Sequence, residues 1–352
     1  RPDGTGGRCL NDLVVKGRIN SLNLTKMVLR FLAGCFTVQG DLKQFYASLM
    51  LNPKFWNLQR VLIKMGLDPN SPEIEAVIRT LIWGIKCVSG QSEGAMMKLA
   101  DEIEEVSPLL ADLLRRSRFV DDLGHSESDE AVLRKLIDDA DELFEQVGLA
   151  CKGWTFSGHS PPEEVGEENG TISIGGLTWW SLIDAKEVPI PKLHFSKKVR
   201  GRLSVGTLVY EGSCLEDLNK FVPENLTRKQ ILSRKASLFD LLGKLTPITA
   251  GFSLDLRAAM KATQGWNDAV PLDIRQKWVQ NFHKLEQLRG IKFQRAVMPM
   301  EAVDGRMHMI NAGDTAKHHI KIAGVWVRFR LKSGKFSCQC LETRTRQSLR
   351  RS

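Results

Sequence analysis

The first part of the chain alternates apolar segments of strand length with longer segments that carry an apolar stripe at helical spacing. A stripe that repeats every three to four residues predicts an amphipathic helix, and alternation in steps of two predicts a strand. This pattern predicts helices over residues 21–36, 95–106 and 109–114 and strands over residues 38–42 and 56–64. Ser71-Pro72-Glu73 is typical of a further helix start, because Pro is favoured at the first helical position.

Two adjacent carboxylates end the next strand-like segment. Phe119 and Val120 are strand formers that run directly into Asp121 and Asp122, and we expect Asp122 to begin a tight turn. Two like charges side by side repel each other, and a divalent cation removes that repulsion because hard cations bind oxygen ligands. A strand that ends in a solvated turn is the alternative interpretation, since Asp is a common turn residue.

A helix and a strand complete this first region. Ser128 is the predicted N-cap of the helix, Gly148 its predicted end, and residues 149–156 form the predicted strand. The resulting order, strand–helix–strand–strand–helix–strand, is that of a ferredoxin-like split unit, which predicts an α+β fold. In that unit the end of the first strand lies close to the central hairpin, so we expect Asp41 to meet Asp121.

The second part of the chain begins with a Pro-, Gly- and Glu-rich linker at residues 158–170. Residues 172–180 then read as a strand that ends in Trp179-Trp180, and residues 227–289 as helices broken at Pro247 and Pro271. The tryptophan pair either contacts a ligand or seals a small core. The packing surface predicted for the helices contains Leu238, Phe239, Leu241, Leu242, Leu245, Trp266 and Trp278. Residues 307–340 alternate again and predict strands.

Composition and the absence of long apolar runs argue against a membrane-spanning or secreted protein. The chain is 42% hydrophobic and 26% charged, as in globular proteins. We find no apolar run of bilayer length and no signal peptide. The seven cysteines are scattered, and the Cys338/Cys340 spacing is not that of a zinc knuckle. We therefore expect reduced thiols and an intracellular location, cytoplasmic (including virus-like particles) or nuclear.

The charge distribution favours a polyanionic partner. The net charge is +9 and the isoelectric point is near 9.2, which suits phosphate neutralisation. Three arginines flank the acid pair: Arg115, Arg116 and Arg118. Residues 192–202 combine basic side chains with His194 and Phe195, a composition that suits a nucleic-acid groove or, alternatively, a solvated loop. The basic side chains of that stretch are Lys192, Lys197, Lys198, Arg200 and Arg202.

The order and spacing of several motifs resemble the reverse transcriptase region of LTR retrotransposons of the BEL/Pao group. Those motifs are the Arg8-to-Leu13 block, Asp41 with Tyr46, the Phe119-to-Asp122 run, residues 152–158, and residues 233–247. The resemblance covers nearly the whole chain and implies an RNA-directed DNA polymerase with a palm fold. In that family an extended basic fingers segment precedes this point, so we expect a partial copy with weak activity, or none, on primed RNA.

The resemblance also implies which residues carry the chemistry. Asp41 and Asp121 would bridge two Mg²⁺ or Mn²⁺ ions, Asp122 would be a looser ligand or an electrostatic neighbour, and Leu42 would offer its carbonyl. Two such ions can activate a primer 3′-hydroxyl and hold the leaving pyrophosphate.

Three further residues match the family's nucleotide-binding positions. Tyr46 matches the aromatic that lies under the sugar, with a core aromatic as the alternative, and Phe45 is the expected core neighbour. Lys152 matches a lysine near the triphosphate, with a solvated strand lysine as the alternative. Gln91 follows Val88-Ser89-Gly90, where many relatives have Ser-Pro, so this segment departs from the family pattern.

The resemblance divides the chain into four segments. They are a palm with partial fingers (1–160), a linker with a primer-grip-like hairpin (161–226), a helical thumb or connection (227–290) and a truncated RNase H-like segment with a basic tail (291–352). The implied partners are an RNA or DNA template-primer, deoxynucleoside triphosphates and other parts of a retroelement polyprotein, and no membrane.

The last segment has few acids. We expect Asp314 to end a strand of an RNase H-like sheet without hydrolytic activity, because Glu342 is the only later acid. The basic tail that follows Leu341 has a composition that predicts disorder. An aspartic protease motif would need Gly where Ala316 stands.

Two rival functions stay open. A decayed or domesticated retroelement fragment, catalytically inactive and at most binding nucleic acid, would keep the fold without the activity. A signalling receiver also uses a strand-end acid pair with Mg²⁺, but the hairpin after Asp122 argues against the repeated strand–helix units that it needs.

Overall fold

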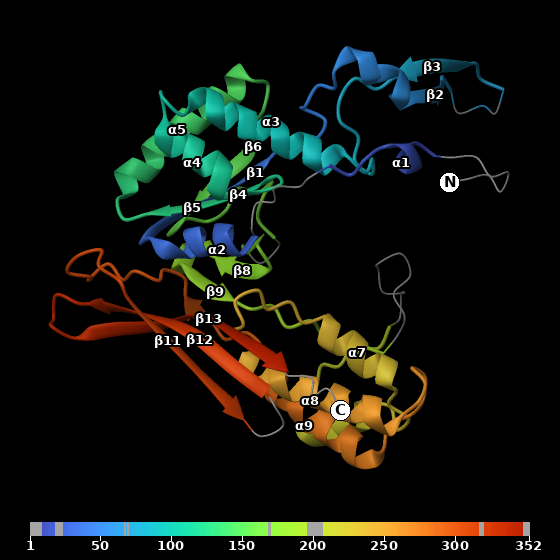
Figure 1. The fold of residues 1–352 in the computed structure, drawn as a ribbon, viewed down its shortest axis with the longest axis vertical. Coiled ribbons are helices and arrows are strands. Elements are labelled where there is room, and N and C mark those ends of the chain that lie inside the picture. The colour runs from blue at the N-terminus through green and yellow to red at the C-terminus, as the bar shows by residue number, and fades with distance from the viewer. Residues whose placement is uncertain are drawn as a thin grey trace. The chain divides into compact units, whose positions relative to one another are not determined.

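The computed structural model describes residues 9–17, 24–66, 68, 70–167, 170–195, 207–316 and 320–347. The chain has mixed helix and sheet structure and divides into two compact units (Figure 1). The first unit contains Arg1–Ile174 and Ser181–Ile183, and the second contains Gly175–Trp180 and Asp184–Ser352. No helix in the described part of the chain is long and apolar enough to cross a membrane.

The helices of the first unit are α1 (Leu10–Leu13), α2 (Leu24–Ala33), α3 (Val88–Ile103), α4 (Pro108–Arg116), α5 (Glu130–Gln146) and the 3₁₀ turns η1 (Pro53–Gln59) and η2 (Ser181–Ile183). Its strands are β1 (Phe36–Leu42), β2 (Arg60–Lys64), β3 (Glu73–Val77), β4 (Arg118–Phe119), β5 (Asp122–Glu127), β6 (Cys151–Phe156) and β7 (Ile172–Ile174).

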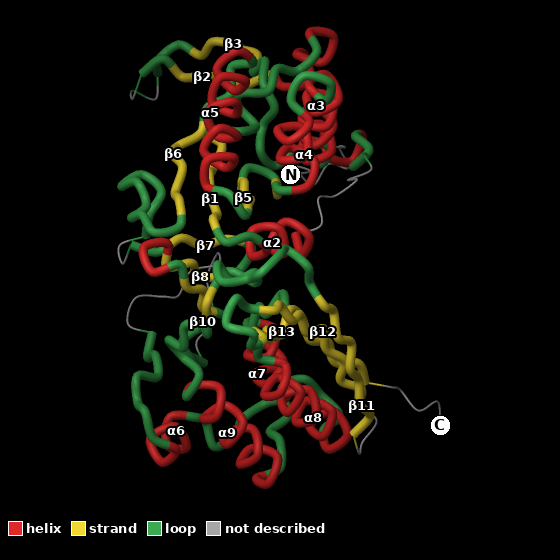
Figure 2. The backbone as a smooth tube through the Cα atoms, turned by 90° about the vertical axis from the view of Figure 1, so that its left-hand side faces the viewer, coloured by secondary structure: helices red, strands yellow, loops and turns green. Residues whose placement is uncertain are grey.

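A four-stranded antiparallel sheet with the order β4-β5-β1-β6 is the centre of this unit. With α3–α4 before β4 and α5 before β6, the chain follows the predicted ferredoxin-like order. Helix α2 covers one face of the sheet, and α4 and α5 cover the other (Figures 1 and 2). Neighbouring residues of β5 show the alternation, since Leu123 packs against α4 and α5 while Gly124 lies against Met27 of α2.

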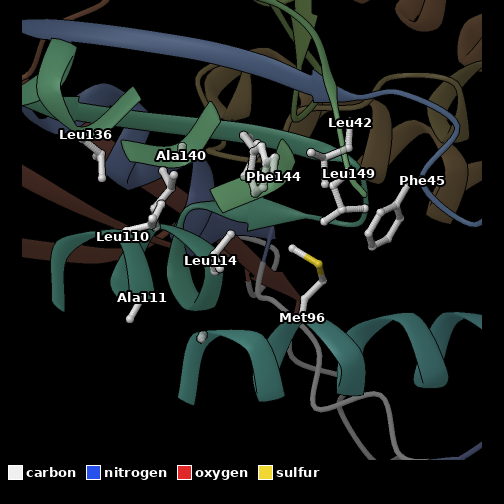
Figure 3. Packing of buried hydrophobic residues seen from close by; sticks show 13 residues of the cluster. Leu42, Phe45, Met96, Leu110, Ala111, Leu114, Leu136, Ala140, Phe144 and Leu149 are labelled. Carbon is white, nitrogen blue, oxygen red and sulfur yellow. The ribbon is translucent and has the colours of Figure 1, made fainter. Parts of the chain in front are cut away.

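The main core cluster fixes the end of β1. Leu42 and Phe45 are buried in it together with side chains of α3, α4 and α5 (Figure 3). The cluster also contains Met96, Ala100, Leu110, Ala111, Leu113, Leu114, Leu123, Leu136, Ala140, Phe144 and Leu149. Full burial of one large apolar side chain contributes about 1.5–3 kcal/mol, so the backbone around Asp41 is held by strong packing on both sides.

Three predictions for the first unit are wrong about element type or start. Residues after Pro72 form strand β3, not a helix, because they pair with β2 in register and place acids opposite bases. Arg60 and Glu75, for example, form an ion pair at 2.5 Å. Helix α3 starts at Val88, earlier than predicted, and α5 is capped by Asp129 instead of Ser128, since the Asp129 carboxylate accepts the Ala131 N–H at 2.8 Å.

The second unit contains helices α6 (Leu215–Phe221), α7 (Arg228–Ala236), α8 (Thr246–Ala262) and α9 (Leu272–Glu286) and strands β8 (Leu177–Trp180), β9 (Ala185–Glu187), β10 (Phe293–Gln294), β11 (His308–Ala316), β12 (Ile320–Arg330) and β13 (Phe336–Gln347). Strands β8, β9 and β10 pair antiparallel, and β11, β12 and β13 form a second antiparallel sheet. Pro247 and Pro271 stand at the starts of α8 and α9, where a missing N–H costs nothing, so they begin helices instead of breaking them.

The C-terminal tail is partly ordered, contrary to the sequence-based expectation. Residues 342–347 belong to β13, where they pair with β12 from Val325 back to Ile320. The backbone hydrogen bonds of this long hairpin compensate for the low apolar content of the segment. Residues 348–352 lie outside the described residues.

A buried lysine joins β9 to β10. The Lys186 ammonium donates to the carbonyls of Gln294 at 2.7 Å and Arg295 at 2.9 Å. Burial, and then repulsion from Lys244 and Arg295, lowers the pKa of Lys186 to about 7. The folded unit therefore holds this proton less tightly than the unfolded chain does.

Gly34 and Gly94 give a matched test of the packing of the first unit. A Cβ at Gly34 would lie 2.5–2.8 Å from backbone atoms of Glu127, whereas a Cβ at Gly94 meets nothing within 4 Å. We expect Gly34→Ala to lower the free energy of unfolding by about 1–3 kcal/mol. Gly94→Ala, inside α3, should raise it by about 0.5–1 kcal/mol. Thermal melts followed by circular dichroism measure both, and equal shifts would contradict this account of Gly34.

Lys186 gives a pH-dependent test of the second unit. Between about pH 7 and the ordinary lysine pKa of about 10.4, the unfolded chain binds more protons at this residue, so stability rises with pH. From pH 7 to pH 9 the wild-type protein should gain about 1–3 kcal/mol relative to Lys186→Met. Urea unfolding at several pH values measures the slope of the free energy of unfolding against pH. The exposed control Lys284→Met should keep the wild-type slope, and a wild-type slope in Lys186→Met would refute the assignment.

Candidate active site

The first unit brings the predicted acids together at one end of its central sheet. Asp41 of β1 and Asp122 of β5 are direct partners in the antiparallel register. Directly opposite residues of such a pair project from the same face, with their Cβ atoms about 4.5–5.5 Å apart. The Leu42 N–H donates to the Asp121 carbonyl at 2.9 Å, which joins the turn that carries Asp121 to the end of β1.

The turn between β4 and β5 is two residues long, and its position corrects the prediction. Phe119 pairs with Asp122, so Val120 and Asp121 are the two turn residues and Asp122 begins β5. Val120 has φ +58°, a value that the tight hairpin geometry requires and that a β-branched residue rarely adopts. The sequence prediction placed the turn two residues too late, because strand propensity gives no indication of a positive φ at valine.

Arg118 holds this turn from inside the protein. Its guanidinium is fully buried and donates to the Val120 carbonyl at 2.7 Å and to the Glu93 carboxylate of α3 at 2.8 Å. Burial lowers the pKa of Arg118, against the attraction of Glu93. Sequence reasoning missed Arg118 and Glu93 as supporting residues, because nothing in the sequence indicates that they pair across the fold.

The charges of the acids influence one another strongly. Burial, and then the charges of Asp121 and Asp41, raises the pKa of Asp122 to about 7. The Lys152 ammonium of β6 lies 2.7 Å from Asp41 Oδ1, and this contact raises the pKa of Lys152. Lys152 is therefore charged at neutral pH and partly offsets the charge of the acids. Its position near a triphosphate stays a prediction.

The donor set suits a hard divalent cation. Asp41 and Asp122 are opposite each other in the sheet, and burial, followed by the charges of Asp121 and Asp41, raises the pKa of Asp122. The buried Asp41 Oδ1 accepts no hydrogen bond of regular geometry. Oxygen ligands of this kind are those that Mg²⁺ prefers. Within the described residues, however, no three acidic, histidine or cysteine side chains are already arranged around one metal position. Such an ion would have to compete with Lys152 for Asp41.

The two aromatic residues after Asp41 have different environments. Phe45 is buried, as expected, and Tyr46 is partly buried beside it, with ring centroids 5.5 Å apart. Arg118 lies over the Phe45 ring at 5.8 Å. Tyr46 is thus packed against the core beside Phe45 without being fully enclosed by it.

Gln91 is not joined to the acids by any contact described for it. It is the fourth residue of α3, exposed, and its side chain lies near Cys87. It lines an apolar pocket with Leu10, Val14, Leu51, Phe55, Leu58 and Val88, among others. The nucleotide-binding interpretation of Gln91 remains a prediction from the resemblance alone.

The arginines near the acid pair are engaged in ion pairs. Arg115 pairs with Asp101 at 2.5 Å and Glu104 at 2.8 Å, and Arg116 pairs with Asp112 at 3.1 Å. Carboxylates within α4 and at the end of α3 thus engage these arginines, and the polyanion-binding flank stays a prediction.

The basic stretch of the second unit is only partly described. Lys192 pairs with Glu211 at 2.9 Å, and His194 is buried. Phe195 is partly buried and packs against Phe221 and Trp278, with ring centroids 6.0 and 6.3 Å away. Its role in a nucleic-acid groove stays a prediction. Lys197, Lys198, Arg200 and Arg202 lie outside the described residues.

The tryptophan pair at the end of β8 mainly serves packing. Trp179 is fully buried and donates to Asp184 at 3.0 Å. Lys292 lies over the ring of Trp180 at 3.5 Å from its centroid, a cation–π contact that covers one face of the indole. The interpretation of a sealed small core fits Trp179.

Asp314 lies inside a strand and does not end it. Within β11 it pairs with Ile322, two residues before the strand ends at Ala316. Glu342 of β13 is the strand partner of Val325 of β12, and Val325 is in turn the partner of Asn311 of β11. The Glu342 carboxylate forms an ion pair with Arg344. The two acids are thus three residue positions apart along the strands, about 10 Å, and are also separated across the sheet by the intervening strand β12.

Comparison with known families adds one match. A family model described as Pao retrotransposon-like RNaseH-like domain matches residues 227–351. This range includes both the helices α7–α9, predicted as a thumb or connection, and the sheet β11–β13. No curated protein matches the sequence significantly. Over residues 227–351 the match agrees with the BEL/Pao resemblance and supports a region of a BEL/Pao retrotransposon polyprotein.

Proposed function

We propose that the first unit is the palm of an RNA-directed DNA polymerase and that it transfers nucleotides to a primer 3′-hydroxyl. The observation that carries this proposal is the convergence of Asp41, Asp121 and Asp122 at the end of a β-α-β-β-α-β sheet. The family match in the second unit supports a retroelement origin, in which such an enzyme would be expected.

The acids would have distinct roles. Asp121, on the tip of a rigid hairpin, and Asp41, at the end of β1, would be the principal ligands of two Mg²⁺ or Mn²⁺ ions. Such ions, when bound, lower the pKa of the attacking hydroxyl and stabilise the charge on the leaving pyrophosphate. Asp122, with a pKa near 7, would be an electrostatic neighbour that keeps a proton about half of the time at neutral pH.

The nucleotide would approach beside Lys152 and Tyr46. Lys152 is charged at neutral pH, so it can bind a triphosphate oxygen when the nucleotide competes for its contact with Asp41. The partly buried ring of Tyr46 offers an apolar surface to the sugar. The rigid backbone of Leu42, tied to Asp121, would hold its carbonyl at the metal site.

One observation favours the second candidate, a catalytically inactive fragment that at most binds nucleic acid. Lys152 already compensates the charge of Asp41, and within the described residues the acids do not form a ready metal cluster. A palm that had lost its activity could keep this arrangement, because the ion pair stabilises the fold without a metal.

Primer extension separates the two candidates. With Mg²⁺ or Mn²⁺, a primed RNA template and deoxynucleoside triphosphates, we expect weak extension that depends on the metal. Asp121→Asn should reduce the rate at least 100-fold, more than the loss of a supporting residue costs (about 10–100-fold). The control Asp138→Asn removes the same charge from the exposed side of α5 and should leave the rate unchanged.

Two outcomes decide against the polymerase. Extension that survives in Asp121→Asn would show that a contaminant or another site is responsible. Absence of extension in the wild-type chain, with normal binding of the primed template, would favour the inactive fragment.

The RNase H-like segment gives a separate prediction. Hydrolysis of an RNA strand needs several carboxylates around one phosphate, and Asp314 and Glu342 are about 10 Å apart along the sheet. We expect an RNA–DNA hybrid incubated with the chain and Mn²⁺ to remain uncut, as seen on a denaturing gel. Cleavage that disappears in Asp314→Asn would refute this expectation.

A further inference from the structure

A polar cavity of about 290 Å³ lies in the second unit, between the end of α7, the start of α8 and the last part of β13. Five side-chain hydroxyls line it, those of Thr246, Thr249, Ser253, Thr343 and Thr345. Two cations, Lys235 and Arg344, and one carboxylate, Asp240, complete its polar lining. Hydroxyl and cationic donors around one open space are the groups that bind phosphate oxygens.

The cavity is built by the motif at residues 233–247, to which the polymerase proposal gives no role. Lys235, Asp240, Gly243 and Thr246 belong to that motif and line the cavity. Strand β13 approaches the motif closely, since the Thr343 N–H donates to the Leu242 carbonyl at 2.9 Å. Gly243 has φ +68°, and a Cβ there would collide with the Thr343 carbonyl, so this approach requires glycine.

The acidic side chain of the cavity is already compensated. The Asp240 carboxylate accepts the N–H groups of Lys244 at 2.8 Å and Leu245 at 2.6 Å. Lys244 is close to Asp240 and also donates to the Cys340 carbonyl. The amides at this turn are thus satisfied, and a ligand would have to be bound by the side chains of Lys235, Arg344 and the hydroxyls.

The positive charge of Lys235 is less well compensated. This side chain is partly buried, and burial lowers its pKa. Among the described residues it forms no ion pair, and the Asp240 carboxylate of the same cavity is bound by backbone N–H groups. Arg344, by contrast, pairs with Glu342. In the same unit, Lys186 experiences the repulsion of Lys244 and Arg295. A partly buried cation without a counter-ion is stabilised when an anion binds beside it.

We propose that this cavity binds a phosphate group of a nucleic-acid strand. Lys235 provides the charge, and the hydroxyls of Thr249 and Thr246 donate hydrogen bonds to the phosphate oxygens. Because these contacts reach the backbone of the strand and not its bases, binding is independent of base sequence. The proposal does not depend on the polymerase, because the cavity lies wholly in the second unit.

Salt-dependent binding of a labelled single-stranded oligonucleotide tests the proposal on the full chain. Lys235→Met keeps the apolar stem of the lysine and removes the charge, so the affinity at low salt should fall about tenfold, the loss of one charge-assisted hydrogen bond. The slope of log K against log salt should also decrease by about 0.7, the value for one lost phosphate contact on a single strand. Thr249→Val should lower the affinity with an unchanged slope.

The matched control is Lys229→Met, which removes an exposed lysine from the same helix, α7, and should change neither affinity nor slope. Inorganic phosphate should compete with the oligonucleotide in the wild-type chain and less in Lys235→Met. Equal affinities and slopes for Lys235→Met and Lys229→Met, with melting temperatures that show both are folded, would overturn the proposal. Phosphate competition of equal strength in the wild-type chain and in Lys235→Met would also overturn the proposal. Asp121→Asn should bind as the wild type does, so a failure of the polymerase proposal is distinguishable from a failure of this one.

Discussion

The side chain of Arg118 is fully buried, and its contacts determine where the acid-bearing turn lies. It donates to the carbonyl of Val120, whose positive φ is unfavourable for a β-branched residue, and to the carboxylate of Glu93 on α3. Strained backbone of this kind costs about 1–3 kcal/mol and persists only where the surroundings hold it. The strand pairs of β4 with β5 and the buried ion pair together hold it, and the tip of the hairpin is therefore rigid.

This rigidity has a consequence for the acids. Asp121 cannot move away from Asp41, because the Leu42 N–H binds its carbonyl and the core holds Leu42 and Phe45. The repulsion that results is relieved in two ways, by protonation of Asp122 and by the ammonium of Lys152. In a site that binds a cation, the negative charge of the carboxylates has to be offset before the ion binds, and both effects do this. An inactive descendant of such a site would also retain Lys152.

Periodicity in the sequence was sufficient to predict the core elements of the first unit, and the strand order followed from the alternation of strands and helices. The acids and Lys152 were proposed as site residues because their motifs resemble those of a known family, and the structure places Asp41 next to Asp122 and Lys152. The position of the turn could not be predicted from the sequence, since the positive φ at Val120 is imposed by hairpin geometry and by Arg118. Strand β3 was predicted as a helix, because Ser71-Pro72-Glu73 is a helix-start signal that consists of adjacent residues. The pairing of this segment with β2 depends on residues that are distant in the sequence. The arginines near the acids looked available from composition alone, yet their partners are acids of α3 and α4.

The central claim is that Asp41 and Asp121 form a site for divalent cations at the tip of the hairpin. Anomalous diffraction from crystals of the chain grown with Mn²⁺ tests it most directly. The account predicts a Mn²⁺ peak with carboxylate oxygens of Asp41 and Asp121 at about 2.0–2.6 Å and with Lys152 displaced from Asp41. Carboxylates of Asp41 and Asp121 more than about 10 Å apart, beyond the reach of a bridging ion, would contradict it.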